Sequence, residues 1–223
     1  MSANLMSLAR SGGKFLKLYG DRKMMMKPLP YDAEVDWLQG DGVAYIDLGY
    51  GVTATTESYL DIGFYPTHLG GNGEFFAGWQ LSNGANGQWI SITKTGETKY
   101  SNGIAPYFTI SSTPEDYVEM HLQSGDYHAN INSERVVTMT RTTNIHYWAT
   151  FFRRTTNYNS DVTKGLLSCA RLVYAQGGDG TNEFNLIPVR KDGVGYMYDQ
   201  ISGQLFGNAA GTGAFVIGPD KTI

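Results

Sequence analysis

The densest group of acidic side chains in the sequence is Glu115-Asp116-Tyr117-Val118-Glu119. Glycoside hydrolases need two carboxylates, one as nucleophile or base and the other as proton donor. Glu115 and Glu119 have the same strand parity, but the preceding Pro114 indicates that a strand begins here, which places the carboxylates at its solvated edge. The sequence also lacks a Gly-x-Ser-x-Gly elbow, a His-Glu-x-x-His motif and a phosphate-binding loop. It therefore predicts no catalytic residues and a protein that is not an enzyme.

His121 and His128 are candidates for binding a metal ion. Apolar and polar residues alternate over residues 118–122 and 127–131, around a Ser-Gly-Asp turn, which predicts a hairpin. In it His121 lies opposite His128 or Asn130, depending on the turn, and opposed Cβ atoms are about 5 Å apart. Two imidazoles without a nearby carboxylate or third histidine make a poor metal site. We therefore predict a solvated polar face and no metal.

Two further features bear on cofactors and redox chemistry. Asp179, Asn182 and Glu183 lie in a glycine-rich acidic loop, and such oxygen ligands suit Ca²⁺. A solvated turn is the simpler interpretation, so no cofactor is predicted and calcium is the alternative.

Cys169 is the single cysteine, which excludes an intrachain disulfide. Its place in a strand-like run predicts a small core residue.

Aromatic side chains are candidates for contacts with carbohydrate. Sugar-binding sandwiches use aromatic faces together with polar groups, although part of any such set belongs to the core. The candidates are Trp79, Trp89, Tyr100, Tyr107, Trp148 and Tyr158.

β-Strands must position all of these side chains. Twenty-eight glycines, fifteen tyrosines and only 17% charged residues favour short strands joined by tight turns. Besides the hairpin, we predict strands over residues 58–65, 75–79, 88–92, 135–140, 146–152, 166–174, 184–189 and 214–217. About a dozen strands at this spacing require two packed sheets. The fold class is therefore all-β, and no apolar run is long enough to span a membrane.

The closing run has a physical interpretation of its own. In the strand 194–199, Tyr196 and Tyr198 share one face, while Met197 and Asp199 share the other. Pro188 is interpreted as the end of the preceding strand, because proline cannot donate a ladder hydrogen bond.

Residues 1–30 differ from the rest of the chain in charge. Their six Lys and Arg residues against Asp21 give +5, so the remainder of a chain with net charge -4 carries -9. Five of the eight methionines also lie here, and Met adapts to irregular surfaces. We predict a docking arm that orders only against an acidic partner; a solvated tail is the alternative. Its docking residues are Arg10, Lys14, Lys17, Arg22, Lys23, Met24, Met25, Met26 and Lys27.

From about residue 31 to residue 219 the chain resembles the LamG-like, concanavalin A-like jelly-roll proteins of gut Bacteroidetes and their phages. The resemblance rests on residues 34–49, the strand 167–174, and the closing Pro-Val-Arg-Lys, Gly-Tyr-Met-Tyr-Asp and Ser-Gly-Gln-Leu-Phe-Gly-Asn motifs. Val43 and Ala44 replace the family's Thr and Gln, and residues 175–184 depart from its usual loop. The resemblance implies a jelly-roll β-sandwich over residues 31–223, preceded by the arm.

These observations predict a non-enzymatic structural protein of a phage virion: a capsid decoration, head-fibre or tail-associated subunit anchored by its arm. Its expected partners are other virion proteins and further copies of itself. The outer face is then available for host or mucosal glycans, whereas a membrane or nucleic acid is not expected as a partner. The alternative is an independent, lectin-like carbohydrate-binding module of a gut bacterium, associated with the cell.

Overall fold

A computed structural model of the chain describes residues 9–11, 14–16, 28–67, 74–80, 88–92, 97–101, 106–140, 145, 147–152, 154–156, 161–163 and 170–222. Within these ranges the structure has β-strands and no helix, which confirms the all-β prediction. No helix in the same ranges is long and apolar enough to cross a membrane.

The larger of the two main sheets is antiparallel throughout the pairs that the structure describes. Its strands are β3 (Ala33–Glu34), β4 (Leu38–Gly40), β6 (Tyr59–Pro66), β11 (Val118–Gln123), β12 (Asp126–Ile131), β13 (Glu134–Met139), β17 (Ala170–Gly178), β18 (Glu183–Lys191), β19 (Val194–Asp199), β20 (Leu205–Phe206) and β21 (Phe215–Ile217). The main path runs β13-β12-β11-β6-β17-β18-β19-β20, and β4 joins β17 to β21 at one side.

The second sheet follows the order β10-β9-β8-β7-β14-β5, with β15 and β16 added beside β7. Its strands are β5 (Ile46–Val52), β7 (Glu74–Gln80), β8 (Gln88–Ile92), β9 (Glu97–Ser101), β10 (Pro106–Ser111), β14 (Tyr147–Phe151), β15 (Arg154–Thr156) and β16 (Asp161–Thr163). β15 pairs with β7 in parallel, whereas the other described pairs of this sheet are antiparallel.

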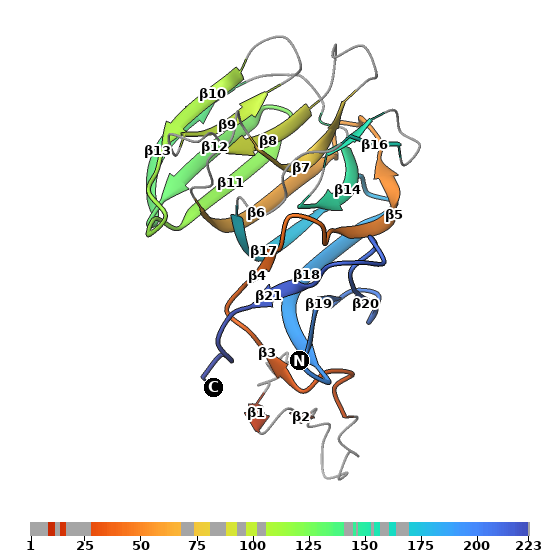
Figure 1. The fold of residues 1–223 in the computed structure, drawn as a ribbon. Coiled ribbons are helices and arrows are strands. Elements are labelled where there is room, and N and C mark those ends of the chain that lie inside the picture. The colour runs from red at the N-terminus through yellow and green to blue at the C-terminus, as the bar shows by residue number, and fades with distance from the viewer. Residues whose placement is uncertain are drawn as a thin grey trace, which may run out of the picture.

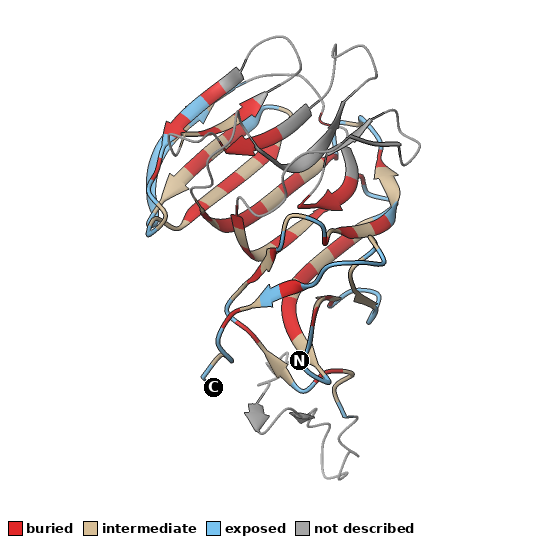
Figure 2. Ribbon diagram, viewed as in Figure 1, coloured by how far each residue is buried: buried red, intermediate tan, exposed pale blue. Residues whose placement is uncertain are grey.

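The two sheets lie one over the other and enclose the hydrophobic core (Figure 1). Aromatic pairs join them: the rings of Tyr100 on β9 and Tyr127 on β12 stack 5.8 Å apart, and Phe151 on β14 meets Phe184 on β18 edge-on at 6.0 Å. Buried and partly exposed residues alternate along the strands of the larger sheet (Figure 2). This period of two is the pattern expected of sheets with one buried face, and it confirms the predicted two-layer sandwich.

The hairpin predicted over residues 118–131 is confirmed. β11 and β12 bury the predicted apolar set, Val118, Met120, Leu122, Tyr127 and Ala129, while Ile131 is partly buried against the core. The turn is Ser124-Gly125, because Gln123 pairs with Asp126, and Gly125 adopts a φ of 89° that favours glycine. His121 therefore pairs with His128 rather than Asn130.

The closing strand is as predicted, but the role given to Pro188 was wrong. On β19, Met197 and Asp199 are buried, while Tyr196 and Tyr198 are partly exposed. Pro188 lies inside β18, and its carbonyl accepts a hydrogen bond from Val35 N at 3.0 Å. In an antiparallel strand, the N–H and C=O of one residue point to the same side. On that side the ladder with β17 ends at Leu186 and the ladder with β3 begins at Val189, so the missing N–H falls in a gap between two ladders.

β17 continues beyond the predicted strand end to Gly178, which leaves only residues 179–182 as the turn before β18. The sequence pattern did not predict this longer strand, because glycine is depleted in strands and β17 ends with Gly177 and Gly178. A Cβ on Gly178 would overlap the Asn182 carbonyl and the Glu183 carboxylate, so the turn closes tightly over it. Cys169 lies outside the described residues.

The two ends of the sandwich are joined to each other. Val35 and Asp220 form an isolated antiparallel bridge, and Lys221 N donates to the Glu34 carbonyl at 2.9 Å. Nearby, the Arg190 guanidinium donates to the Asp220 carboxylate at 2.7 Å. The first and last described segments of the sandwich therefore lie side by side.

The arm is described only in part. β1 (Ala9–Ser11) and β2 (Lys14–Leu16) form an antiparallel pair that contains Arg10 and Lys14. The other predicted docking residues, Lys17, Arg22, Lys23, Met24, Met25, Met26 and Lys27, lie outside the described residues. The docking role of the arm therefore stays a prediction.

Candidate functional site

The surface of the larger sheet that faces away from the second sheet carries polar and aromatic side chains. We call it the outer face. On β6, Asp61, Gly63 and Tyr65 alternate with the core residues Ile62 and Phe64, so these three positions belong to the outer face. The strand register places Glu119 opposite Gly63, His121 opposite Asp61 and Arg171 opposite Tyr65.

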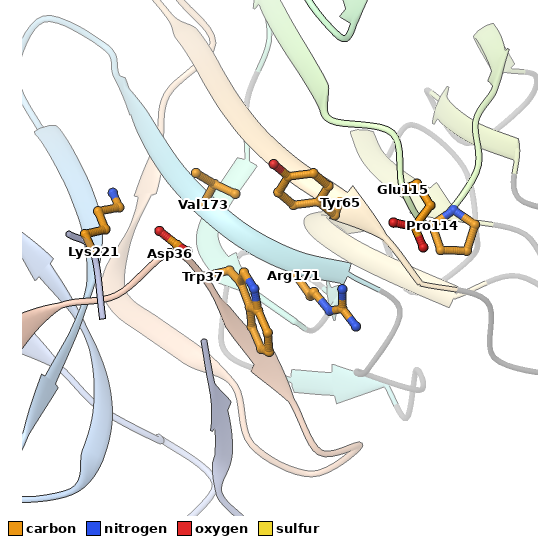
Figure 3. Close-up of a pocket in the computed structure, with 8 residues that line it drawn as sticks. All are labelled: Asp36, Trp37, Tyr65, Pro114, Glu115, Arg171, Val173 and Lys221. Carbon is orange, nitrogen blue, oxygen red and sulfur yellow. The ribbon is translucent and has the colours of Figure 1, made fainter. Parts of the chain in front are cut away.

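A pocket of about 340 Å³ opens on the outer face (Figure 3). Its walls come from the segment between β3 and β4, from β6 and β17, from the loop between β10 and β11, and from the C-terminal segment. The lining residues are Asp36, Trp37, Tyr65, Pro114, Glu115, Arg171, Val173 and Lys221. Five separate parts of the chain therefore meet in one concave site.

Trp37 is the largest aromatic side chain of the pocket, and two neighbours position it. The Arg171 guanidinium carbon lies 4.8 Å from the centre of the Trp37 ring, which is cation–π geometry. Gly218 permits the indole to approach the backbone, because a Cβ there would lie 2.9 Å from two ring carbons. The Gly218 N–H also donates to the Trp37 carbonyl at 2.9 Å.

Asp116 fixes the loop that contributes Pro114 and Glu115. One carboxylate oxygen accepts hydrogen bonds from Thr113 N at 2.7 Å and Thr113 Oγ1 at 2.9 Å, and the other accepts one from Asn132 Nδ2 at 2.7 Å. These donors, led by the Thr113 N–H, hold the pKa of Asp116 below its ordinary value. The carboxylate stays ionised at neutral pH and keeps the loop closed.

The acidic run that suggested hydrolysis is divided between a loop and a strand. Glu115 lies in the loop, β11 begins only at Val118, and Glu119 lies on the strand. The two carboxylates therefore do not share a strand: Glu115 is exposed, as predicted, but the predicted strand start near Pro114 was wrong, and Glu119 is partly buried within β11 rather than at its edge.

A group of tyrosines continues the outer face beyond the pocket. The rings of Tyr65 and Tyr117 are 5.3 Å apart, and the Tyr117 hydroxyl and Tyr174 ring cover the space left by the missing side chain of Gly63. Burial, followed by the nearby charges of Glu119 and Asp61, raises the pKa of Tyr174 to about 12. The pKa of Tyr117 is also raised, chiefly by burial. Both phenols are therefore neutral hydrogen-bond donors at ordinary pH.

The charges of the pocket are balanced. Asp36 and Glu115 are acidic, whereas Arg171 and Lys221 are basic. A balanced set does not select for a highly charged ligand, while an indole, a phenol and several polar groups suit a polyhydroxylated one.

At the opposite end of the outer face, the predicted histidine pair has carboxylate neighbours. His121 Nδ1 lies 2.5 Å from Asp61 Oδ1, and His128 Nδ1 lies 2.8 Å from Asp126 Oδ1. The two rings stack 4.7 Å apart. The expectation that no carboxylate lies near the pair was therefore wrong. Asp126 is close in sequence, but Asp61 comes from a strand 60 residues away.

The carboxylates of the loop considered for calcium face protein donors. Asp179 accepts from Thr53 N, Thr181 N and Asn182 N at 2.9 to 3.0 Å. Burial raises the pKa of Asp179, but its backbone donors together hold it below its ordinary value. Glu183 accepts from Gly180 N and the Tyr59 hydroxyl. These bonds explain the loop as a closed turn that joins β17–β18 to the end of β5.

None of the aromatic residues predicted to contact glycans is among the described residues that line this pocket. Tyr100 is 2% exposed and packs between Phe108 and Tyr127, so its assignment to a surface site was wrong. Trp79, Trp89, Tyr107 and Trp148 lie on β7, β8, β10 and β14, with side chains outside the described set, and Tyr158 lies wholly outside it. Sequence analysis missed Trp37 and Tyr65. The outward parity of Tyr65 in the strand 58–65 was a usable signal, whereas Trp37 lies in an irregular segment.

Comparison with known proteins identifies the fold. No family model matches the chain, and no curated protein matches it. Among solved structures, it is similar to a native heptameric SAP-like pentraxin from Limulus polyphemus, with a TM-score of 0.51 and 10% sequence identity over 84% of this chain and 96% of that one. The fold is thus a concanavalin A-like jelly-roll β-sandwich, as predicted. The comparisons give no support to the narrower resemblance to proteins of gut Bacteroidetes and their phages.

Proposed function

We propose that the sandwich is a non-enzymatic carbohydrate-binding module whose ligand packs against Trp37 in the pocket of the outer face. The observation that carries this proposal is the indole positioned by Arg171 and Gly218, in a pocket of balanced charge that Tyr65 also lines. Sugars present an apolar ring face and a rim of hydroxyl groups, which aromatic and polar side chains recognise together. The jelly-roll fold is compatible with this role.

The size of the pocket limits the ligand. At about 340 Å³ it lies near the lower end of the range of ligand pockets, which is roughly 300–1,000 Å³. We therefore propose a monosaccharide or the end of a glycan chain as the bound unit. Arg171 and Lys221 supply donors, Asp36 and Glu115 supply acceptors, and the Tyr65 ring extends the apolar surface.

The test is a glycan array probed with the full chain, followed by calorimetry on the best glycan. Trp37→Ala should weaken binding at least tenfold. Val136→Ala, an exposed position on β13 of the same sheet but outside the pocket, is the matched control and should leave the affinity unchanged. The proposal fails if the full chain binds no glycan, or if Trp37→Ala binds as tightly as the wild type.

A second proposed role concerns residues 1–30. We propose that this arm anchors the chain to an acidic protein surface of a phage virion, as a capsid decoration, head-fibre or tail-associated subunit. The contrast between an arm of charge +5 and a remainder of -9 supports this role, because basic arms bind acidic surfaces. A glycan-binding outer face is compatible with such an anchor. The similar pentraxin is heptameric, which supports a homo-oligomer here as well.

The anchoring role is tested by particle incorporation. Deletion of residues 1–30, or replacement of the six basic residues of the arm by glutamine, should abolish incorporation while glycan binding persists. Native mass spectrometry of the same samples reports the oligomeric state. Normal incorporation of both variants would disprove the anchor, and capsid, portal or tail genes beside the coding sequence would support it.

A further inference from the structure

The β11–β12 hairpin brings two histidines and an aspartate together at the end of the outer face far from the pocket. His121 and His128 are paired residues of the ladder, and their rings stack with centroids 4.7 Å apart. Asp126 follows the two-residue turn directly and shares the outward parity of His128. One ligand atom from each of the three residues lies within 4.8 Å of the others.

Asp61 orients the first histidine from the neighbouring strand. Its carboxylate lies 2.5 Å from His121 Nδ1, and an ionised carboxylate only accepts, so Nδ1 carries the proton. In the neutral ring the lone pair is then on Nε2, the nitrogen that faces Asp126. Metal-binding histidines usually donate their second ring N–H to a carboxylate in this way, which fixes the tautomer and the ring orientation.

The spacing between His121 and Asp126 fits a shared ion better than a hydrogen bond. His121 Nε2 lies 3.9 Å from Asp126 Oδ2, which is beyond hydrogen-bond range. Two ligands bound at about 2.1 Å to a tetrahedral ion lie about 3.4 Å apart, so about half an ångström of side-chain movement closes the gap. His128 Nδ1, 2.8 Å from Asp126 Oδ1, completes the group when a metal replaces its proton.

We propose that His121, Asp126 and His128 bind a divalent transition-metal ion of the zinc class, with Asp61 as the orienting partner of His121. Two imidazoles and one carboxylate suit Zn²⁺, Co²⁺, Ni²⁺ or Cu²⁺, whereas Ca²⁺ and Mg²⁺ prefer all-oxygen sites. Solvent water fills the remaining coordination, since the Asp126 side chain is 59% exposed. The competing interpretation is two histidine–carboxylate pairs that hold no metal.

The experiment titrates tag-free, EDTA-treated full-length protein with Zn²⁺ by calorimetry and with Co²⁺ by absorption spectroscopy. One ion should bind per chain. His121→Ala and His128→Ala should each weaken Zn²⁺ binding at least tenfold, and Asp61→Asn by roughly tenfold or more. Thr138→Ala changes the next residue in the same cross-strand row and is the matched control, with unchanged affinity expected.

Two outcomes overturn the proposal. The first is a wild-type protein that binds neither ion, which leaves the paired histidine–carboxylate interpretation. The second is unchanged binding in both histidine variants, which would place the ion elsewhere, for example at one of the other two histidines. Ring-nitrogen NMR of the wild type avoids dependence on variant folding: Zn²⁺ should shift His121 Nε2 while Nδ1 stays protonated.

Discussion

The guanidinium carbon of Arg171 lies 4.8 Å from the centre of the Trp37 ring. Trp37 belongs to an irregular segment, whereas Arg171 lies on a central strand between β6 and β18. Arg171, which is held in a strand, therefore positions the ring of Trp37, which is not part of a strand. The proposed ligand site depends on this contact and on the space above Gly218.

Gly218→Ala tests whether the position of the indole matters. The new Cβ would lie 2.9 Å from two Trp37 ring carbons, so the ring must move away from its place beside Arg171. We expect glycan affinity to fall about fivefold, which corresponds to loss of an exposed cation–π contact of about 1 kcal/mol. Calorimetry measures this, with the exposed neighbour Val216→Ala as control. Unchanged affinity would show that the ligand does not use the positioned ring.

Gly63→Ala should destabilise the sandwich. Its Cβ would overlap the Tyr117 hydroxyl and the Tyr174 ring, and overpacking costs about 1–3 kcal/mol. Urea unfolding measures the loss. The double variant Gly63→Ala, Tyr174→Ala removes one of the two overlapping groups, so it should lose less than the sum of the single changes. Additive losses would mean that the overlap is relieved in another way.

Asp199 is a buried carboxylate that holds the turn after β19. It is 3% exposed and accepts from Asn185 N at 2.8 Å, from Ile201 N and Ser202 N at 3.1 Å, and from Ser202 Oγ. Asp199→Ala leaves these backbone donors without their acceptor and should cost about 2–4 kcal/mol in unfolding free energy. Ser202→Ala removes only one hydroxyl donor and should cost about 1 kcal/mol or less. Equal losses in the two variants would contradict this account.

The Asp116 contact predicts how the pocket loop responds to acid. Its pKa is lower in the folded chain than its ordinary value of 3.8, so the carboxylate contributes stability above pH 3.8 that is lost as the pH falls through the lowered pKa. We expect the Thr113 amide signal in NMR to stay constant from pH 7 to pH 5 and to move only below about pH 4. In Asp116→Asn the movement should disappear. A midpoint above 3.8 would refute the assigned hydrogen bonds.

Local patterns in the sequence predicted part of the strands, whereas β5, β9 and β10 were not predicted. The alternation of Leu60, Ile62 and Phe64 located β6 and its buried face, and the Ser-Gly-Asp segment limited His121 to two partners, of which His128 is the observed one. These features depend on residues close in sequence. The strand at Pro188 was predicted less well, because a gap between two ladders arises only from the tertiary arrangement.

The candidate sites depended on contacts that no local pattern encodes. Asp61 meets His121 across 60 residues, and Arg171 meets Trp37 from a strand much later in the sequence. Tyr100 and Tyr65 are both strand tyrosines, yet one is a core residue and the other lines the pocket. Which face of a strand is buried depends on the second sheet, and composition alone does not specify it.

The bridge between Val35 and Asp220 has a topological consequence. Because the first and last segments of the sandwich lie side by side, a short linker from residue 222 to residue 31 would close the domain into a ring. New termini could then be opened at the Ser124-Gly125 turn, which joins β11 to β12 in two residues. In such a circular permutant, a protein fused to the new termini would lie beside the histidine pair. The present first and last segments of the sandwich, next to Lys221, would be joined by the linker.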